Sequence, residues 1–505
     1  MRLPRLYVYP SGLLRSRLRG FTAVRIPDCE RRLPHGADIL RADRENKILD
    51  GPIRSAVLWL ALPVLGEQAL NAAVTWNDTL VAGRISAQAT GAVGLASYIS
   101  WLMSMIAWMV DTGATVLVAR AVGGGNYREA QRATNQAFLL ALMLGTIGTA
   151  AVFGCAPGIA RIMNLGPEGS QIASSFMRID TVGYLGNAVA LAMASCLRGA
   201  GDTRTPMVVL GGVNVVNMIF TWLLTFGGGP VPAFGTNGIA WGTAIARWSG
   251  GIWMVWLLQR RRPRTGGGRA PLSFLRLHPL LMSPDWGILR RILSVGLPAA
   301  MDGALAFSGH FIFTTIVTRV PSMFTPTVLY AAHVVGIRIE SLSYLPANAW
   351  SVAASTMVGQ NLGGGQPERA RRSANEAVRQ AMMLLAFTGL LYFFAARPLF
   401  RILSNDPDVW ACGTPALKGL ACVQVPLAIL IVYLGALRGA GDTRVPMVIT
   451  ALGVGLLRIP VAFLGGVILR GGLLGAWMGM FTDIVVRSGL LAWRFHTNRW
   501  ARIRV

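Results

Sequence analysis

Apolar stretches of about 20 residues recur along this chain and constrain its fold more than any other feature. Examples are IRSAVLWLALPVLGEQALNAAV from residue 53 and TNQAFLLALMLGTIGTAAVFG from residue 134. A stretch of that length spans a bilayer as an α-helix, because lipid offers the backbone no hydrogen-bond partners. With about twelve such stretches, the sequence predicts an all-α integral membrane protein with twelve transmembrane helices. Only 14% of the residues are charged, against about a quarter in soluble proteins.

Basic residues are distributed unevenly between the connections that join these predicted helices. The net charge is +25, yet the odd-numbered connections carry only Arg84, Arg161, Arg319, Arg397, Arg401 and Arg470. Most other basic residues fall in the N-terminal region, the even-numbered connections and the C-terminus. Because cytoplasmic loops are enriched in Lys and Arg, this asymmetry predicts a multi-pass protein of the plasma (inner) membrane with both termini in the cytoplasm. It explains the positive charge without nucleic acid, which we exclude as a partner.

The octet LRGAGDTR occurs at residues 197–204 and again at 437–444, an offset of 240. The same offset aligns LVARAVGGGNYREAQRATNQA at 117–137 with MVGQNLGGGQPERARRSANEA at 357–377. Earlier in the chain, an offset of 235 aligns the segments that start at Leu62 and Leu297. The chain is therefore a duplication, and each half has six predicted helices. An even number gives both halves the same orientation, so they are parallel repeats.

The duplication predicts four regions. Residues 1–50 form a basic cytoplasmic tail, 51–262 a first lobe with helices 1–6, 263–288 a cytoplasmic linker, and 289–505 a second lobe with helices 7–12 and a short basic tail. Both octets fall between an even-numbered helix and the next. Their glycines permit the left-handed turn that ends a helix, and Asp or Thr can cap the helix that follows. We interpret the octet as a cytoplasmic turn and not as a functional site.

A polar stripe follows one face of the first predicted helix. Its residues stand at i, i+4, i+8 and i+11, and they are Glu67, Asn71, Thr75 and Asp78. Because ionisable side chains are costly inside a bilayer, the stripe is expected to face a wet cavity or a polar partner helix. Packing between helices is the alternative for each residue, and it is favoured for Glu67.

The repeat distinguishes the two acids of this stripe. Asp302 aligns with Glu67, whereas Phe313 aligns with Asp78. An acid kept in both halves indicates an architectural role, and an acid present in one half indicates a specialised site. Asp78 is therefore the stronger functional candidate.

Three polar residues lie within two turns of the fifth predicted helix, NVVNMIFTWLLTFG, namely Asn214, Asn217 and Thr221. Asn217 and Thr221 share a face at i, i+4, from which they could hydrogen-bond Asp78 or supply oxygen ligands to a cation. Packing alone stays open as the alternative, because Asn and Thr often join helices in membranes.

Other charged residues in the predicted helices suggest ion pairs. Asp483 and Arg487 stand four residues apart and are predicted to pair. Arg247 aligns with Arg487 but has Thr243 where the second half has Asp483, so it needs a partner on another helix. We place Asp180 at the outer interface of the membrane.

An apolar cavity wall is expected to include some of Trp76, Trp101, Trp108, Met103, Met105 and Met109. For any one of these residues, packing against lipid or other helices is the favoured interpretation. Motifs of catalysis are missing: the chain has no HExxH, GxSxG or P-loop sequence, and its five His and five Cys show no ligand spacing. We predict no enzyme activity, no metal and no organic cofactor.

Three segments resemble the multidrug and toxic compound extrusion (MATE) family. They are AAHVVGIRIESLSYLPANAWSVAASTMVGQNLGGGQPERARR, the doubled LRGAGDTRxPM, and DGPIRSAVLWLALPVLG. The resemblance covers roughly residues 48–495 and is closest to the DNA-damage-inducible protein F-like bacterial branch. It implies two six-helix lobes around a V-shaped central cavity. It also implies an antiporter that exchanges H+ or Na+ for organic, often cationic, drugs.

The resemblance assigns residue roles unevenly. WNDTLVAGR resembles the end of the family's first helix, where Asp78 falls on the coupling aspartate. NMIFTWLLTFG resembles a segment in which many members have Asn, three residues and then Asp; here Asn217 matches and Thr221 replaces the acid. An acid that another branch has on the tenth helix is missing from CVQVPLAILIVYLGALRG.

The resemblance therefore leads us to expect cation coupling at Asp78, Asn217 and Thr221. The substrate cavity is expected to be lined by Asn71, Thr75, Asp78, Glu67 and Asn214. H+ is favoured over Na+ because the second acid is absent, and we expect a monomer that binds a small organic substrate. A flippase for lipid-linked oligosaccharides is the alternative within the related superfamily, and a membrane-embedded enzyme is a remote one.

Overall fold

The computed structural model describes residues 48–85, 87–162, 166–228, 230–260, 274–278 and 281–503. Within these ranges the regular elements are helices, and β pairing is confined to an isolated bridge between Gly228 and Val231. The predicted basic tail lies outside the described residues as far as residue 47, and so does much of the predicted linker.

Over the described ranges the helices follow the predicted order, six segments in each half. The first half comprises α2 (Ile53–Gly83), α3 (Ala87–Gly123), α4 (Tyr127–Ile162), α5 (Gly166–Val182) continued by α6 (Tyr184–Gly199), α7 (Arg204–Phe226) and α8 (Thr236–Arg260). The second half comprises α9 (Trp286–Val317), α10 (Pro326–Gly363), α11 (Pro367–Leu403), α12 (Pro407–Cys422) continued by α13 (Gln424–Gly439), α14 (Arg444–Leu452) continued by η3 (Gly453–Arg458), α15 (Ile459–Phe463) and η4 (Leu464–Ile468), and α16 (Gly472–His496). The turn η5 (Arg499–Arg502) follows.

Among the described residues, length and composition alone identify seven helices that could cross a membrane, and the pair α12–α13, bent by 57°, would be an eighth. The other segments carry charged side chains that neighbouring helices cover, such as Glu340 of α10 and Asp483 of α16. Helix α9 begins at Trp286, inside the predicted linker, because the Asp285 side chain caps it by accepting from the N–H groups of Gly287 and Ile288.

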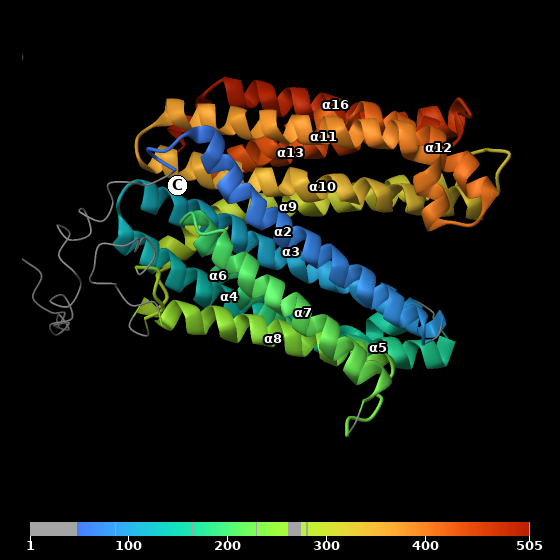
Figure 1. Cartoon of the computed structure of the whole chain (residues 1–505), viewed down its shortest axis with the longest axis horizontal. Coiled ribbons are helices and arrows are strands. Elements are labelled where there is room, and N and C mark those ends of the chain that lie inside the picture. The colour runs from blue at the N-terminus through green and yellow to red at the C-terminus, as the bar shows by residue number, and fades with distance from the viewer. Residues whose placement is uncertain are drawn as a thin grey trace, which may run out of the picture. The chain divides into compact units, whose positions relative to one another are not determined.

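The first helix of each half crosses from one lobe to the other, as Figure 1 shows for α2. Leu60 and Val64 of α2 belong to the buried apolar cluster of the second lobe, whereas Val81 packs with α4, α5 and α8 of the first. Helix α9 does the reverse: Ile292 lies in the first-lobe cluster and Val317 in the second-lobe cluster. Burial of these apolar side chains ties both crossing helices to both lobes.

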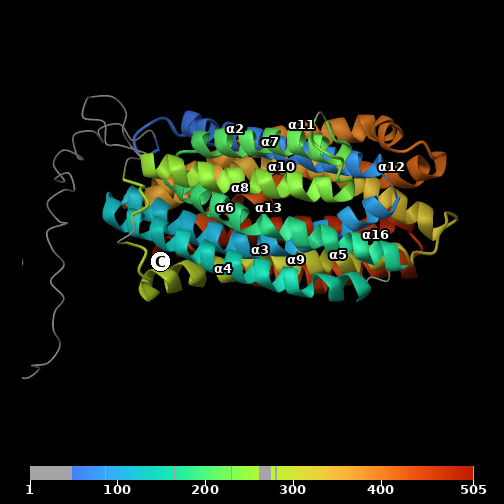
Figure 2. The ribbon, with the colours of Figure 1, turned by 90° about the horizontal axis from the view of Figure 1, so that it is seen from below.

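The two lobes meet along a seam formed by α3 with α9 and α10. A Cβ atom on Gly296 of α9 would lie 1.9 Å from the carbonyl oxygen of Met109, and one on Gly123 would lie 1.9 Å from that of Gln360. Only glycine permits backbones to approach so closely. Figure 2 shows that the long helices of both lobes run along a common direction, so the seam follows their length.

Candidate functional site

Glu67, the first residue of the polar stripe on α2, is buried in an ion pair with Arg198 of α6. Arg198 Nη1 lies 3.1 Å from Glu67 Oε1, and its Nη2 lies 3.0 Å from Asp111 Oδ1 of α3. The second lobe repeats this pair between Asp302 of α9 and Arg438 of α13. The structure thus places Glu67 in a buried ion pair, as its alignment with Asp302 suggested.

The middle of the stripe packs on α7. Asn214 Nδ2 donates a hydrogen bond of 2.9 Å to Asn71 Oδ1. Thr75 Oγ1 donates to the carbonyl of Asn71 in its own helix. Asn71 and Thr75 are exposed, whereas Asn214 is buried. These three predicted cavity residues therefore lie along the contact between α2 and α7.

Asp78 lies half-buried near the far end of α2. Asn77 Nδ2 lies 3.4 Å from Asp78 Oδ1, and Asn77 Oδ1 accepts from Trp222 Nε1 of α7 at 2.8 Å. Among the described residues, Arg247 and Asp180 are the charged groups that interact electrostatically with Asp78. No ion pair within 4.0 Å neutralises Asp78 among the described residues.

Asn217 and Thr221 are buried between α7 and α8, on the face that faces Thr243. Asn217 Nδ2 donates to Thr243 Oγ1 at 3.2 Å, and that hydroxyl donates to the carbonyl of Ile239. Asn217 Oδ1 and Thr221 Oγ1 have no hydrogen-bond partner in the described part of the chain. Nor does a hydrogen bond between described residues join Asp78 to either of them.

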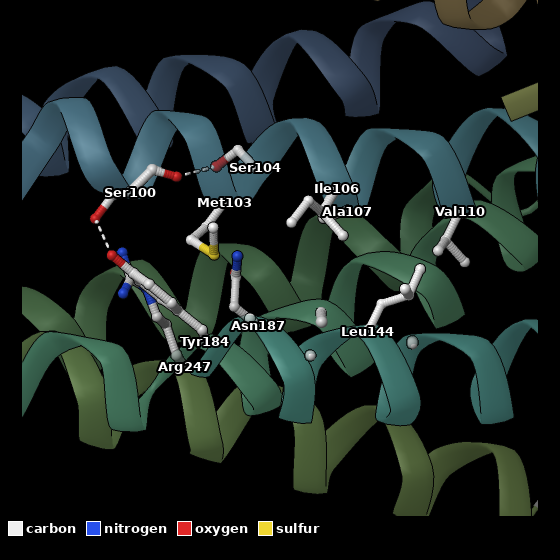
Figure 3. Close-up of a pocket in the computed structure, with 14 residues that line it drawn as sticks. Ser100, Met103, Ser104, Ile106, Ala107, Val110, Leu144, Tyr184, Asn187 and Arg247 are labelled. Atoms are coloured by element: carbon white, nitrogen blue, oxygen red, sulfur yellow. Dashed lines mark hydrogen bonds between the residues drawn. The ribbon is translucent and has the colours of Figure 1, made fainter. Parts of the chain in front are cut away.

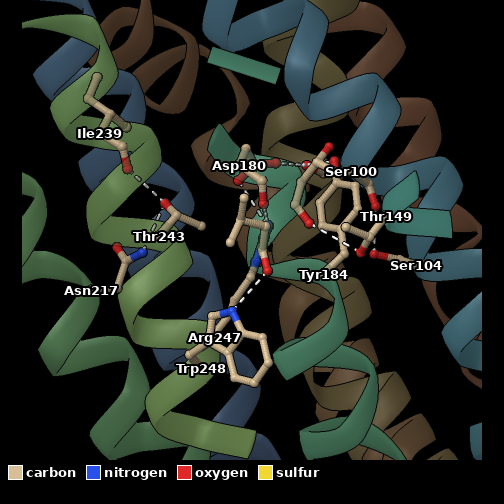
Figure 4. A network of polar contacts seen from close by, with 12 residues as sticks. Ser100, Ser104, Thr149, Asp180, Tyr184, Asn217, Ile239, Thr243, Arg247 and Trp248 are labelled. Carbon is tan, nitrogen blue, oxygen red and sulfur yellow. Dashed lines mark hydrogen bonds and ion pairs between the residues drawn. The ribbon is translucent and has the colours of Figure 1, made fainter. Parts of the chain in front are cut away.

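A polar network around Asp180 lies beside this site (Figure 4). Arg247 Nη1 lies 2.8 Å from Asp180 Oδ1, and Ser100 Oγ donates to Asp180 Oδ2 at 2.8 Å. The Arg247 guanidinium also lies over the ring of Tyr184. Arg247 therefore has the partner on another helix that its sequence required. Asp180 is buried near the end of α5, and its placement at the outer interface of the membrane stays a prediction.

A cavity of about 40 Å³ lies next to this network, between α3, α4, α6 and α8. Its volume would hold a few water molecules. Figure 3 shows Ser100, Tyr184, Asn187 and Arg247 at its polar end and Met103 on its wall. The other aromatic and methionine candidates do not gather there: Trp101 stacks on Phe307 of α9, with ring centroids 3.6 Å apart.

Sequence reasoning missed the roles of Ser100, Tyr184 and Thr243. Their signal was weak, because Ser, Tyr and Thr occur widely in membrane helices. Arg247 was the residue from which the network could have been inferred. An arginine inside a membrane helix that has no acid nearby in the sequence is expected to pair with an acid on another helix. Among the described residues, no three His, Cys, Asp or Glu side chains gather as metal ligands do.

Two repeated six-helix lobes, crossed by α2 and α9, and polar residues collected inside the first lobe define an integral membrane transporter fold. The MatE family model matches residues 63–223 and 298–464. The probable multidrug resistance protein NorM of Thermotoga maritima is 32% identical over 450 residues, covering 89% of this chain and 94% of that protein. The multidrug resistance protein MdtK of Yersinia pseudotuberculosis is 26% identical over 453 residues, covering 88% and 95%.

Solved structures share the fold. A MATE protein in a straight conformation superposes with a TM-score of 0.82 at 18% identity, covering 90% of this chain and 98% of that one. A transporter of the MOP superfamily from Pyrococcus furiosus, described as having a binding pocket of reverse polarity, gives 0.81 at 17% identity, with coverage of 89% and 97%. This chain belongs to the MatE family, and it is a multi-pass membrane transporter and not an enzyme.

Proposed function

We propose that this transporter exports organic, cationic and amphiphilic drugs or metabolites in exchange for H+ or Na+, by alternating access. The carrying observation is a surplus of acid inside the first lobe. Among the described residues of the polar stripe and of the ion pairs of Arg198 and Arg247, four carboxylates stand against two guanidinium groups, namely Glu67, Asp78, Asp111 and Asp180 against Arg198 and Arg247. A desolvated surplus of negative charge favours a cation as its partner.

Asp78 is the carboxylate that supports exchange, because the other acids have arginine partners. A proton on Asp78 and a cation beside it each neutralise the same charge, so they are alternatives. Binding of one therefore weakens binding of the other. An unpaired charge in a partly desolvated site costs several kcal/mol, enough to bias two conformations that differ by a few kcal/mol.

The choice of coupling ion rests on two opposing features. Thr221 in place of a second acid favours H+, because one carboxylate suffices to carry a proton. The unpartnered oxygens Asn217 Oδ1 and Thr221 Oγ1 favour Na+, since buried acceptors without partners are costly and hard cations take oxygen ligands. Asp78 would provide the charge in either case.

The remaining parts of the proposal follow from the relatives and from charge. NorM and MdtK are both described as multidrug resistance proteins, which supports drug export by this chain. The arginine-rich turns support a cytoplasmic location for both termini in the plasma (inner) membrane, and we propose a monomer. A flippase for lipid-linked oligosaccharides is disfavoured, because its phosphate would require surplus basic charge in the cavity.

Transport of an organic cation into the lumen of everted vesicles, whose cytoplasmic face points outward, tests this proposal, and this inward transport is the efflux reaction of the cell. Wild-type protein should drive efflux under an imposed pH gradient or an imposed Na+ gradient, each applied without the other. Asp78→Asn should abolish the gradient-driven component while the protein still reaches the membrane. Asp408→Asn is the matched control. Asp408 is exposed in the first turn of α12, so this variant should transport normally.

Two outcomes would overturn the proposal. Gradient-driven efflux that survives in Asp78→Asn would remove Asp78 from coupling. Wild-type vesicles in which neither gradient drives any of a panel of organic cations would refute cation antiport itself.

A further inference from the structure

A groove lies between α2 and α7, which run side by side in Figures 1 and 2. Its volume is about 410 Å³, within the range of small-molecule sites of about 300–1,000 Å³. Its walls include Leu58, Trp59 and Leu62 of α2 with Arg204, Met207 and Val208 of α7. Leu62 and Val208 are each 55% exposed, so the groove is open along its apolar wall.

Arg204 gives this apolar groove a positive charge. Its guanidinium carbon lies 5.7 Å from the ring centroid of Trp59, and the residue is exposed. Within the described part of the chain, Arg204 forms no ion pair with an acid. An arginine beside a tryptophan is typical of the level at which lipid headgroups meet the acyl chains. The groove thus combines an unpaired cation with an apolar wall.

The groove also lies where the two lobes join. Leu58 and Trp59 pack against the buried cluster of the second lobe. Val209 and Leu210, which follow the groove residues on α7, belong to the cluster of the first lobe. A molecule held in the groove would therefore contact both lobes at once.

We propose that this groove is a binding site for an anionic phospholipid, whose phosphate pairs with Arg204 while an acyl chain lies along Trp59, Leu62 and Val208. The chemistry requires both parts. Phosphate and carboxylate oxygens suit the planar guanidinium of arginine, and a saturated chain suits the exposed apolar wall. Basic pockets between membrane helices bind anionic lipid headgroups for the same reason. This site is separate from Asp78 and goes beyond the proposed antiport.

The internal repeat supplies a matched comparison. Arg444 and Val448 occupy the positions of Arg204 and Val208, and both are exposed. Ser294, however, aligns with Trp59. The corresponding position in the second half of the chain therefore has the arginine without the tryptophan. We expect it to bind lipid more weakly.

Quenching of tryptophan fluorescence by brominated acyl chains tests the site. The full-length protein would be reconstituted in vesicles of phosphatidylcholine and phosphatidylglycerol, with bromine on the chains of one lipid at a time. The Trp59 signal is the difference between wild type and Trp59→Phe. We expect brominated phosphatidylglycerol to quench this signal with about fivefold higher apparent affinity than brominated phosphatidylcholine, the effect of one basic residue near the surface.

The variants separate the possible outcomes. Arg204→Ala should abolish the preference for phosphatidylglycerol, Arg444→Ala should retain it, and added salt should weaken it. Equal quenching by both lipids, or a preference that survives in Arg204→Ala, would overturn the proposal. A Trp59 signal that neither lipid quenches would show that protein, such as a second copy of this chain, covers the groove. Wild-type elution in size-exclusion chromatography would confirm that each variant folds.

Discussion

Arg198 contacts two carboxylates, whereas its repeat counterpart Arg438 contacts one. Glu67 and Asp302 are the shared partners, and Asp111 is the additional one, with Ser351 at its aligned position. A buried arginine with two acids is more strongly tied to its surroundings than one with a single acid. Its removal leaves more uncompensated charge in a largely buried site.

Arg198→Met should therefore destabilise the protein by about 3–5 kcal/mol, the cost of breaking a buried ion pair. Arg438→Met should cost less, because it leaves Asp302 alone and because Arg438 is more exposed. Thermal unfolding in detergent would measure both. Asp111→Ser, which copies the second lobe, keeps the Glu67–Arg198 pair and should be tolerated. A tolerated Arg198→Met would contradict the structural role of this ion pair.

Thr221→Val separates the two candidate coupling ions, because it removes one unpartnered oxygen and keeps the side chain's volume. H+-driven efflux should stay within about twofold of wild type, since a proton needs no ligand besides Asp78. Where Na+ drives efflux, the Na+ concentration for half-maximal rate should rise about tenfold, the effect of one lost interaction. Efflux rates measured as a function of Na+ concentration at fixed pH give this half-maximal concentration. Strong impairment of H+-driven efflux in Thr221→Val would refute the expectation that Thr221 serves Na+ alone.

Helical periodicity predicted which residues share a face, but it could not identify their partners. The stripe on α2 does face the first lobe, since Glu67 reaches Arg198 and Asn71 accepts from Asn214. Sequence alignment of the halves predicted an architectural Glu67. It could not predict Asp180 as the partner of Arg247, because that contact joins residues far apart in the chain.

At the scale of helices, the sequence predicted the number and order of the segments, whereas the crossing of α2 and α9 emerged only in three dimensions. Both crossing helices are apolar over most of their length, so their sequence does not indicate which lobe covers which half. The breaks at Gly183 and Val423 stand 240 residues apart and follow the repeat. They were not predicted, since Val423 is no helix breaker and Gly occurs in many unbroken membrane helices.

Gly296→Ala tests the close packing of α9 against α3. The added Cβ would lie 1.9 Å from the Met109 carbonyl oxygen, so the helices must separate. We expect a loss of stability of about 1–3 kcal/mol or more from overpacking. Gly489→Ala in α16 is the control, because no atom lies within 4 Å of its Cβ position and alanine favours helix. Thermal unfolding midpoints compare them, and an unchanged midpoint for Gly296→Ala would contradict this packing.

At the scale of the whole molecule, the two octets accept hydrogen bonds that join the lobes. We call these hydrogen bonds, made by Arg120 and Gln360, the clasp. Gln360 Nε2 of the second lobe donates to the carbonyl of Gly199 in the first octet at 2.8 Å. Arg120 of the first lobe donates to the carbonyls of Ala440, in the second octet, and Ile503. Arg120 and Gln360 are themselves aligned by the 240-residue offset. The octet thus supplies each lobe with an internal ion pair and with a carbonyl that the other lobe binds.

The proposed alternating access would require these hydrogen bonds to break in a conformation that opens on the side of the octets. Gln360→Ala should therefore raise the ratio of that open state to the closed state about fivefold. This is the effect of losing one buried hydrogen bond of about 1 kcal/mol. Arg120→Ala should favour it further, because Arg120 makes two such bonds. Spin labels at Asn126 and Gln366, exposed and aligned by the repeat, would report a larger fraction of long distances between them.

Asn361→Ala provides the control for this measurement. Asn361 is buried next to Gln360 on α10, but its side chain donates to Met357 in its own helix. The substitution should lower stability without lengthening the distance between the labels. The same distance change in Asn361→Ala and Gln360→Ala would mean that general loosening of α10 causes it. An unchanged distance in the double variant Arg120→Ala/Gln360→Ala would mean that close glycine packing, and not the clasp, holds the lobes together.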